Sequence, residues 1–251
     1  MNGEVFDCII QARLGSTRFP NKIFEKINNE KMVLEFLLEQ LKYSKFLNNI
    51  IIATTSLDED KKIVDFCKKN NIDYFIGDSE NVLDRYYQCA KKFKSKNIVR
   101  ITSDCPLIDP YLLDKGIKLF LEKKVDFLTN SLEPTFPHGL DFQIFTFNVL
   151  DTTHRKATDS FDKEHVIPYI INQKKNFSNY IMKNNEDLSG YRVTIDWIED
   201  LQLVKNIISM IKKRPIEIND LMKVFLDNPE LLKINSKRHG KNLFLNLTKN
   251  N

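Results

Sequence analysis

The sequence lacks any segment that is long and apolar enough to cross a membrane. None of its apolar runs approaches the roughly 18 residues that a bilayer-spanning helix requires. The N-terminal stretch from Met1 to Asp7 is short and acidic, which is not the pattern of a signal peptide. We therefore expect no membrane partner and a cytoplasmic location.

Cysteine is scarce, with four residues among 251: Cys8, Cys67, Cys89 and Cys105. No two of them form the Cys-x-x-Cys pairs of zinc or redox sites. The first three lie in apolar or helical contexts, which predicts core thiols in a reducing compartment. Cys105 follows an aspartate, but no histidine lies near it in the sequence to activate it as a nucleophile.

A strong charge imbalance is also missing. The chain has 38 basic and 34 acidic residues, a net charge of +4, which is too balanced to indicate a nucleic-acid partner. Hydrophobic residues make up 42% of the chain and charged residues 29%, as in ordinary globular proteins. A length of 251 residues suits one large domain or a domain with an appendage.

Two common phosphate-binding motifs are absent: the Gly-Lys-Ser/Thr ending of a Walker loop and the Gly-x-Gly-x-x-Gly fingerprint. In their place, an apolar strand predicted at 5–10 leads into a basic loop that carries Arg13, Arg18 and Lys22 among small residues. Arginine grips phosphate oxygens in bidentate fashion, and lysine supplies a point charge. The loop therefore predicts phosphate binding, with a solvated basic loop as the alternative.

Apolar strands and amphipathic helices alternate along most of the chain. This alternation predicts an α/β fold with a mostly parallel sheet covered by helices. The expected strands are 5–10, 49–55, 72–76, 97–102, 125–129, 142–147, 178–182 and 191–196. The expected helices contain 33–41, 63–67, 81–93, 113–120, 201–211 and 219–226, and a further helix begins at Asp159 and is interrupted by Pro168.

Two aspartates stand at the ends of predicted strands. Asp104 follows the strand at 97–102, and Asp196 ends the strand at 191–196. The carboxyl ends of parallel strands share one edge of a sheet, where the basic loop also lies. Carboxylates among phosphate-binding cations suggest Mg²⁺, which takes one or two carboxylates together with phosphate oxygens and water. The alternative is that each aspartate caps a turn or helix, although Asp109 before Pro110 is the better cap.

Further polar residues gather in the second half of the chain. A turn-rich loop contains His138 and Asp141, and it is either a substrate loop or a plain connection. Glu164 and His165 have side chains suited to acid/base chemistry. Because they are adjacent, they are not expected to share one helix face. A binding or structural role is therefore favoured for at least one of them.

In their combined order, these motifs resemble the cytidylyltransferases that make CMP-activated acidic sugars, the CMP-sialate and CMP-3-deoxy-manno-octulosonate synthetases. The branch they resemble most is that of the spore coat polysaccharide biosynthesis protein F. The motifs that carry the resemblance lie at 11–22, 100–109, 139–141, 162–166 and 192–196, and it extends over about 5–210.

The resemblance implies a three-layer, Rossmann-like nucleotidyltransferase fold of the GT-A type. It further implies a homodimer that takes CTP and an acidic sugar as substrates, with Mg²⁺ as cofactor. We expect a single domain over 1–233, a subregion at about 135–185 for substrate binding and dimerisation, and a basic tail over 234–251.

The same resemblance matches Arg13, Arg18 and Lys22 to the triphosphate-binding signature, and Asp104 and Asp196 to the metal-binding aspartates. Arg13, Lys22 and Asp104 are accordingly the expected catalytic residues. Asp78, Asn81 and Arg85 are added for the base and ribose because they follow the third predicted strand. The expected nucleotide-binding residues are Ala12, Arg13, Gly15, Ser16, Arg18, Lys22, Asp78, Asn81, Arg85 and Ser103, and the expected substrate-binding residues are His138, Asp141, Gln143, Glu164 and His165.

The sequence departs from the family pattern at two places. Trp197-Ile198 stands where relatives usually show Thr-Pro, and Gln143 stands where this branch often has an acid. Two other functions remain open at this point. One is a nucleotidyltransferase that acts on a sugar phosphate or polyol phosphate, and the other is a non-catalytic nucleotide-binding scaffold of a glycan pathway.

Overall fold

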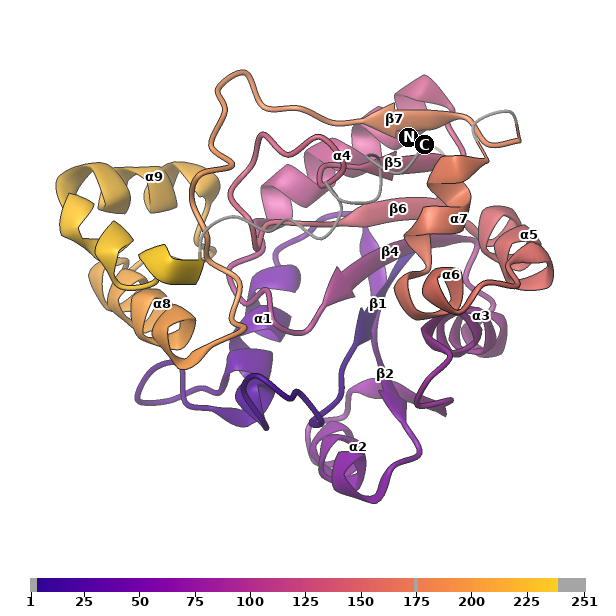
Figure 1. Ribbon diagram of the computed structural model, residues 1–251, viewed down its shortest axis with the longest axis horizontal. Helices are drawn as coiled ribbons and strands as arrows, with labels where there is room; N and C mark the ends of the chain where they lie inside the picture. Colours follow the sequence, from indigo (N-terminus) through magenta and orange to yellow (C-terminus); the bar gives the residue numbers. More distant parts are fainter. Residues whose placement is uncertain (1–3, 174–175, 239–251) are drawn as a thin grey trace.

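The first strand, β1 (Phe6–Gln11), lies inside a seven-stranded sheet of order β3-β2-β1-β4-β6-β5-β7 (Figure 1). The computed structural model describes residues 4–173 and 176–238. The other strands are β2 (Leu47–Thr55), β3 (Asp73–Gly77), β4 (Asn97–Thr102), β5 (Phe127–Thr129), β6 (Gln143–Thr146) and β7 (Asn179–Ile181). Among these described strands, β6 alone runs antiparallel to its neighbours, β4 and β5, so the sheet is mostly parallel, as predicted.

Helices cover both faces of this sheet. They are α1 (Val33–Leu41), α2 (Lys61–Lys69), α3 (Val82–Phe93), α4 (Pro110–Lys123), α5 (Phe147–Lys156), α6 (Ser160–His165), α7 (Ile167–Asn172), α8 (Ile198–Met210) and α9 (Ile218–Asp227). Short 3₁₀ turns occur at Lys22–Phe24, Asp58–Asp60, Pro229–Lys233 and Ser236–Arg238. The three-layer α/β prediction is confirmed.

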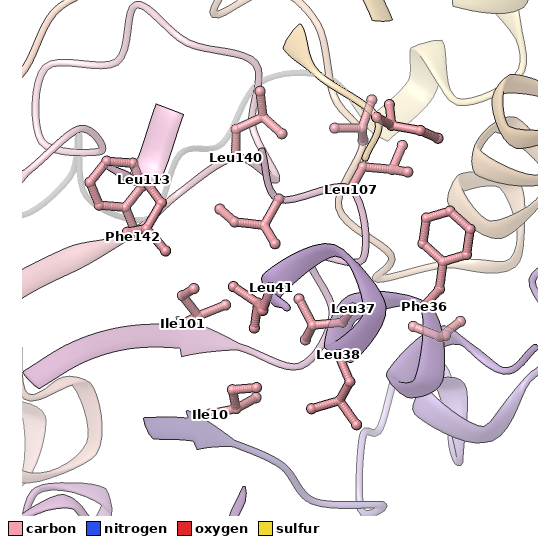
Figure 2. Packing of buried hydrophobic residues seen from close by; sticks show 14 of the residues in the cluster. Ile10, Phe36, Leu37, Leu38, Leu41, Ile101, Leu107, Leu113, Leu140 and Phe142 are labelled. Atoms are coloured by element: carbon pink, nitrogen blue, oxygen red, sulfur yellow. The ribbon is translucent and has the colours of Figure 1, made fainter. Parts of the chain in front are cut away.

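The alternation of side chains along β1 explains why both faces need a helical layer. Cys8 and Ile10 point into one apolar cluster, which includes side chains of α1, α2, α4, α8 and α9. Ile9 points the other way, into a cluster with α3, α5 and α7. A strand that is buried on both sides has a continuous apolar sequence. Figure 2 shows Ile10 and Ile101 of the sheet close to Leu37 and Leu41 of α1.

The strand order creates a crevice at one edge of the sheet. From β1 the chain builds β2 and β3 on one side and then crosses to β4 on the other. The two directions part beyond the carboxyl ends of β1 and β4, where open α/β sheets bind ligands. The basic loop after β1 and Asp104 after β4 both lie there.

The predicted strand at 191–196 is wrong. Within this segment the structure has only an isolated parallel bridge between His138 and Arg192. The chain runs past Asp104 instead, and the amide of Ile195 donates to the Asp104 carbonyl at 2.8 Å. The alternating pattern therefore reflects burial against a loop, because Val193 and Ile195 join the core without entering the sheet.

The helix predicted from Asp159 is broken at a different residue from the one expected. Asp159 caps α6, which ends at His165, and α7 begins at Ile167. The break falls on Val166, whose φ of 69° lies outside the helical region. Pro168 does not interrupt a helix, because it occupies the first turn of α7, where proline is tolerated.

Two further predictions, the basic tail and the lack of a membrane-spanning segment, can be compared with the described residues alone. Ser236–Arg238 of the expected basic tail forms a 3₁₀ turn, and residues 239–251 lie outside the description. Among the described helices, none combines the length and the apolar character needed to cross a membrane.

Replacing Leu37 with alanine tests the α1 layer. Leu37 is fully buried on the sheet face, so its truncation is expected to lower the free energy of unfolding by about 2–5 kcal/mol. The matched control is Leu226→Ala on α9, because Leu226 is 76% exposed. Chemical denaturation should show a change within about 0.5 kcal/mol for the control. Equal losses in the two variants would contradict this packing.

Candidate active site

The basic loop after β1 is held in place by a buried carboxylate. The amide of Leu14 donates to Oδ1 of Asp60 at 2.7 Å, and the Thr55 hydroxyl donates to the other oxygen of the same carboxylate. The amide of Ala12 donates to the Ala53 carbonyl at 3.1 Å. β2 and the turn after it therefore anchor the loop, while the side chain of Arg13 remains exposed.

Lys22 joins the two predicted strand-end aspartates. Its Nζ lies 2.8 Å from Oδ2 of Asp104 and 3.0 Å from Oδ1 of Asp196. Nη2 of Arg18 lies 2.6 Å from the same oxygen of Asp196. Four of the predicted phosphate-binding and metal-binding residues therefore meet at one point.

Lys22, Asp104 and Asp196 shift one another's pKa values. Burial raises the pKa of Asp104, but the charge and hydrogen bond of Lys22 outweigh it and hold the pKa below the usual range. Burial and the charge of Asp104 raise the pKa of Asp196, but the charge of Lys22 and the hydrogen bonds from Arg192 and Lys22 outweigh them and lower it. Burial lowers the pKa of Lys22, but Asp104 and Asp196 raise it by more. All three groups are therefore charged at neutral pH.

A second layer of contacts fixes the two carboxylates. The Thr102 hydroxyl donates to Oδ1 of Asp104 at 2.6 Å. Nη2 of Arg192 donates to Oδ2 of Asp196 at 2.7 Å, and Nε of Arg192 donates to Asp200 at 3.2 Å. Asp200 is fully buried and also accepts from the amide of Asp196 at 3.0 Å. The orientation of Asp196 is therefore set by Arg192 and Asp200, which the sequence did not single out.

A cavity of about 610 Å³ lies beside this cluster. Its walls come from the basic loop, the start of α3, the end of β4 and the helix α6. The residues that line it are Gln11, Ala12, Arg13, Gly15, Ser16, Thr17, Arg18, Lys22, Ser79, Glu80, Val82, Arg85, Arg100, Thr102, Ser103, Asp104, Ser160, Glu164 and His165. Most of the predicted nucleotide-binding residues therefore share one cavity.

Asp78 and Asn81 are not among the lining residues. Asp78 accepts the amides of Glu80 and Asn81, which shapes the turn before α3. Asn81 caps α3 by accepting the amide of Asp84. Of this predicted group only Arg85 lines the cavity. The other two side chains support the turn that presents Ser79 and Glu80.

The predicted substrate residues separate into two groups. His138, Asp141 and Gln143 are not among the residues that line the cavity. Nδ1 of His138 is 2.8 Å from Nη1 of Arg192. Burial raises the pKa of Asp141. Glu164 and His165 both line the cavity, so two adjacent residues of one helix contribute to the same wall. Both belong to the last turn of the six-residue helix α6, at the point where the chain breaks.

Two buried arginines in the cavity wall carry charge without an ion pair among the described residues. Arg85 is 2% exposed and donates to the Asp78 carbonyl. Arg100 is 6% exposed and donates to the side-chain amides of Gln11 and Gln143. Arg100 is not among the site residues predicted from the sequence. The available signal was a cation inside the apolar strand Ile98-Val99-Arg100-Ile101.

The thiol of Cys105 does not suit a nucleophile. Burial, with a further contribution from Asp104, raises its pKa well above the usual value. Its Sγ lies 3.4 Å from the Thr102 hydroxyl and 3.7 Å from that of Thr194. All four cysteines are buried and unpaired, as the sequence predicted for three of them.

Asp104 and Asp196 fit a cation. Their oxygens already converge on one ammonium, that of Lys22. Over residues 4–173 and 176–238, no group of three or more His, Cys, Asp or Glu side chains is placed to hold a metal ion. A divalent ion would therefore need ligands beyond these two carboxylates, and nucleotide phosphates and water supply such ligands.

The sequence model of the cytidylyltransferases matches residues 8–235. The chain belongs to the cytidylyltransferase family. The match covers the basic loop, both aspartates and all of the cavity residues, so this cytidylyltransferase is a CTP-dependent nucleotidyltransferase.

Two relatives match nearly the whole chain. An uncharacterised protein of Methanocaldococcus jannaschii is 36% identical over 230 residues, which cover 91% of this chain and 93% of that protein. The spore coat polysaccharide biosynthesis protein SpsF of Bacillus subtilis is 31% identical over 238 residues, which cover 92% of this chain and 97% of that protein. The resemblance to the SpsF branch is therefore confirmed.

Solved structures support the fold. A cytidylyltransferase from Leptospira borgpetersenii superimposes with a TM-score of 0.86 at 37% identity, over 90% of this chain and 95% of that one. A CMP:2-keto-3-deoxy-manno-octonic acid synthetase complexed with CTP reaches 0.59 at 12% identity, over 82% of this chain and 98% of that one. The second similarity concerns the fold alone. The predicted Rossmann-like nucleotidyltransferase fold is confirmed.

Asp104→Asn tests the charge cluster through the pH dependence of stability. The pKa of Asp104 is lower in the folded protein than the value of about 3.9 in an unfolded chain. Its stabilising contribution is therefore complete above that value and is lost as the pH falls through the folded pKa. Urea unfolding should show the largest difference between wild type and variant at neutral pH. The difference should shrink below about pH 4.

The control for this experiment is Asp58→Asn. Asp58 and Lys61 form an ion pair of 2.8 Å in which both side chains are exposed. Solvent and salt screen such a pair, so its loss should change stability little at any pH. A difference between wild type and Asp104→Asn that stayed constant from neutral to acidic pH would contradict the proposed ionisation of Asp104.

Proposed function

We propose that this cytidylyltransferase transfers CMP from CTP to an acidic 2-keto sugar and releases pyrophosphate, in the biosynthesis of a surface glycan. The observation that carries the proposal is the convergence of Lys22, Asp104 and Asp196 beside a basic cavity. The names of the relatives support it, since they include a polysaccharide biosynthesis protein and a sugar-acid synthetase with bound CTP.

In this mechanism the basic loop binds the triphosphate. Arg13 and Arg18 are exposed at the cavity, while Lys22 is buried beneath them. A hydroxyl of the acceptor attacks the α-phosphorus in line, the bond from that phosphorus to the bridging oxygen of pyrophosphate breaks, and one proton is released. Negative charge grows on the leaving pyrophosphate, and fixed cations beside it stabilise that charge. Positioning and charge neutralisation supply most of the catalysis in such transfers.

Asp104 and Asp196 are the residues that would hold Mg²⁺. When bound, the ion would neutralise phosphate charge and favour the ionised form of the attacking hydroxyl. The protein's own contribution is to fix both carboxylates, through Thr102 on Asp104 and through Arg192 on Asp196.

We further propose that the turn before α3 binds the base and ribose. Arg85 lines the cavity, and its Nε has no partner among the described side chains. Ser79 and Glu80 lie beside it in the cavity wall. We also propose a homodimer whose contacts come from about 135–185. Light scattering coupled to gel filtration measures the mass of the assembly and so tests this.

Removing a cation or a carboxylate of the cluster should abolish most turnover. Lys22→Ala and Asp104→Asn are each expected to lower turnover on the order of 10²- to 10³-fold, the scale of losing one preorganised electrostatic group. Pyrophosphate release with CTP and Mg²⁺ measures it. Lys223→Ala is the control, because Lys223 lies on α9 and pairs with Asp227 at 2.8 Å. Near wild-type turnover in both cluster variants would overturn the assignment.

The acceptor panel consists of sialic, legionaminic, pseudaminic and 3-deoxy-octulosonic acids, each also tested with ATP, GTP and UTP. Release with CTP and one acid would name the substrate. If no acid causes pyrophosphate release although CTP still binds, the acceptor is expected to be a sugar phosphate or polyol phosphate. Product analysis separates the cases, because a CMP-sugar carries one phosphate and a nucleoside diphosphate sugar carries two.

Replacing Arg85 tests the base and ribose contacts. Arg85→Met is expected to weaken CTP binding about tenfold or more, the scale of losing a charge-assisted hydrogen bond. Asn81→Ala removes a helix cap outside the cavity, so it should lower stability and leave the preference for CTP over UTP unchanged. Titration of each variant with both nucleotides measures this. Unaltered CTP binding in Arg85→Met would remove Arg85 from the site.

A further inference from the structure

Arg100 is a buried cation in the middle of an apolar strand. It lies on β4 between Val99 and Ile101, and it is 6% exposed. Val99 and Ile101 face the cluster under α1, so Arg100 points to the opposite face, toward α3. There its guanidinium carbon lies 5.5 Å from the centre of the Tyr86 ring. A leucine or valine would fill such a strand position without any cost of burying charge.

The partners of Arg100 are neutral. Nη1 donates to Oε1 of Gln143 at 2.7 Å, and Nη2 donates to Oε1 of Gln11 at 2.8 Å. Its Nε has no hydrogen-bond partner among the described atoms. No carboxylate lies within ion-pair distance of Arg100 in the described part of the chain. A guanidinium has five N–H donors, so three of them remain unused.

Such an arrangement is costly unless a ligand completes it. A buried charge without a counterion destabilises the fold, and two amide oxygens offset only part of that cost. The geometry is nevertheless fixed, because Nε2 of Gln143 donates to the Ser131 hydroxyl at 3.1 Å. A positioned, uncompensated cation in a cavity wall is typical of an anion-binding site.

The backbone of Arg100 lies farther along the sheet from the basic loop than the end of β4 does, although its guanidinium reaches Gln11 at the start of the loop. Arg100 pairs with Ile9 in the sheet, whereas Gln11, where the loop begins, pairs with Thr102. Two residues of strand correspond to about 7 Å. The triphosphate already has Arg13, Arg18 and Lys22 at the mouth. Because those three cations are available to the triphosphate, we assign the anion that neutralises Arg100 to a second ligand. A neutral base would not supply the missing charge.

We propose that Arg100 binds the carboxylate of the acceptor and selects acidic acceptors over neutral ones. Gln11 and Gln143 position its guanidinium. The assignment rests on the proposed function, in which the second ligand is a sugar acid. It also gives a reason for Gln143 in this chain, since an acid at that position would form an ion pair with Arg100 and satisfy it internally. Glu164 of α6 lines the same cavity without contacting Arg100 within ion-pair distance.

The first test is stability, because a structural arginine and a binding arginine behave in opposite ways. In Arg100→Met an apolar chain of similar length replaces the uncompensated charge. Its melting temperature should equal or exceed that of the wild type. The control is Arg214→Met, because Arg214 lies outside the cavity, over the ring of Phe36 at 4.7 Å. A folded Arg100→Met variant that melts well below both would identify Arg100 as a structural residue and overturn the proposal.

The second test separates acceptor binding from nucleotide binding. In Arg100→Met the KM for the sugar acid should rise on the order of 100-fold, the scale of a lost buried charge-assisted contact. The affinity for CTP should stay within about threefold of wild type. Arg100→Lys should recover part of the loss, because it keeps the charge but not the planar fork. A large change in CTP affinity with an unchanged acceptor KM would overturn the proposal.

The third test is independent of turnover. The melting temperature is measured in the presence of CMP. To this is added either the free acid (3-deoxy-octulosonic or sialic acid) or the corresponding carboxamide. The free acid should stabilise the wild type and not Arg100→Met, and the carboxamide should stabilise neither. Acid-dependent stabilisation without pyrophosphate release would overturn the proposed function and leave Arg100 as an anion site. Equal stabilisation of wild type and Arg100→Met would overturn the role of Arg100 alone.

Discussion

Two carboxylates and one ammonium join three parts of the chain that are far apart in the sequence. Lys22 contacts Asp104 and Asp196, 82 and 174 residues away. Lys22 begins the 3₁₀ turn after the basic loop, Asp104 follows β4, and Asp196 precedes α8. The contact therefore requires the basic loop, β4 and the segment before α8 to be in place together. Like-charged carboxylates brought this close would repel each other, and the ammonium between them removes that repulsion. The charge cluster therefore depends on the complete fold.

Predictions from the sequence were correct where the hydrophobic pattern of a segment arises from the element that it forms. The five parallel strand predictions before residue 130, the basic loop and the aspartate after β4 all follow from periodicity and from the rule that ligands gather at strand ends. The pattern failed at 191–196, because alternation reports which residues are buried and not what buries them. Val193 and Ile195 alternate as in a strand, yet they pack beside the Asp104 loop.

Other site residues could not be found from spacing. Arg192 and Asp200 hold Asp196 through contacts that only the folded chain creates. Glu164 and His165, at the end of α6, line the cavity together, which their adjacent positions in the sequence did not indicate. Arg100 was visible as a charge in an apolar strand. Its meaning depended on the absence of a carboxylate partner among the described residues, and no single sequence can show that.

The cavity uses its cations in two different ways. At the mouth, Lys22 and Arg18 are already paired with carboxylates, so in the described state the cluster is close to neutral. In the proposed mechanism, a triphosphate would compete with Asp104 and Asp196 for these cations, and a divalent ion at the two carboxylates would displace the ammonium from at least one of them. If both bind as proposed, the triphosphate would pair with the cations and the divalent ion with the carboxylates, so the binding of each would favour the binding of the other. In the wall of the same cavity, Arg100 has no carboxylate partner among the described residues, so its charge is available to an anion that reaches it.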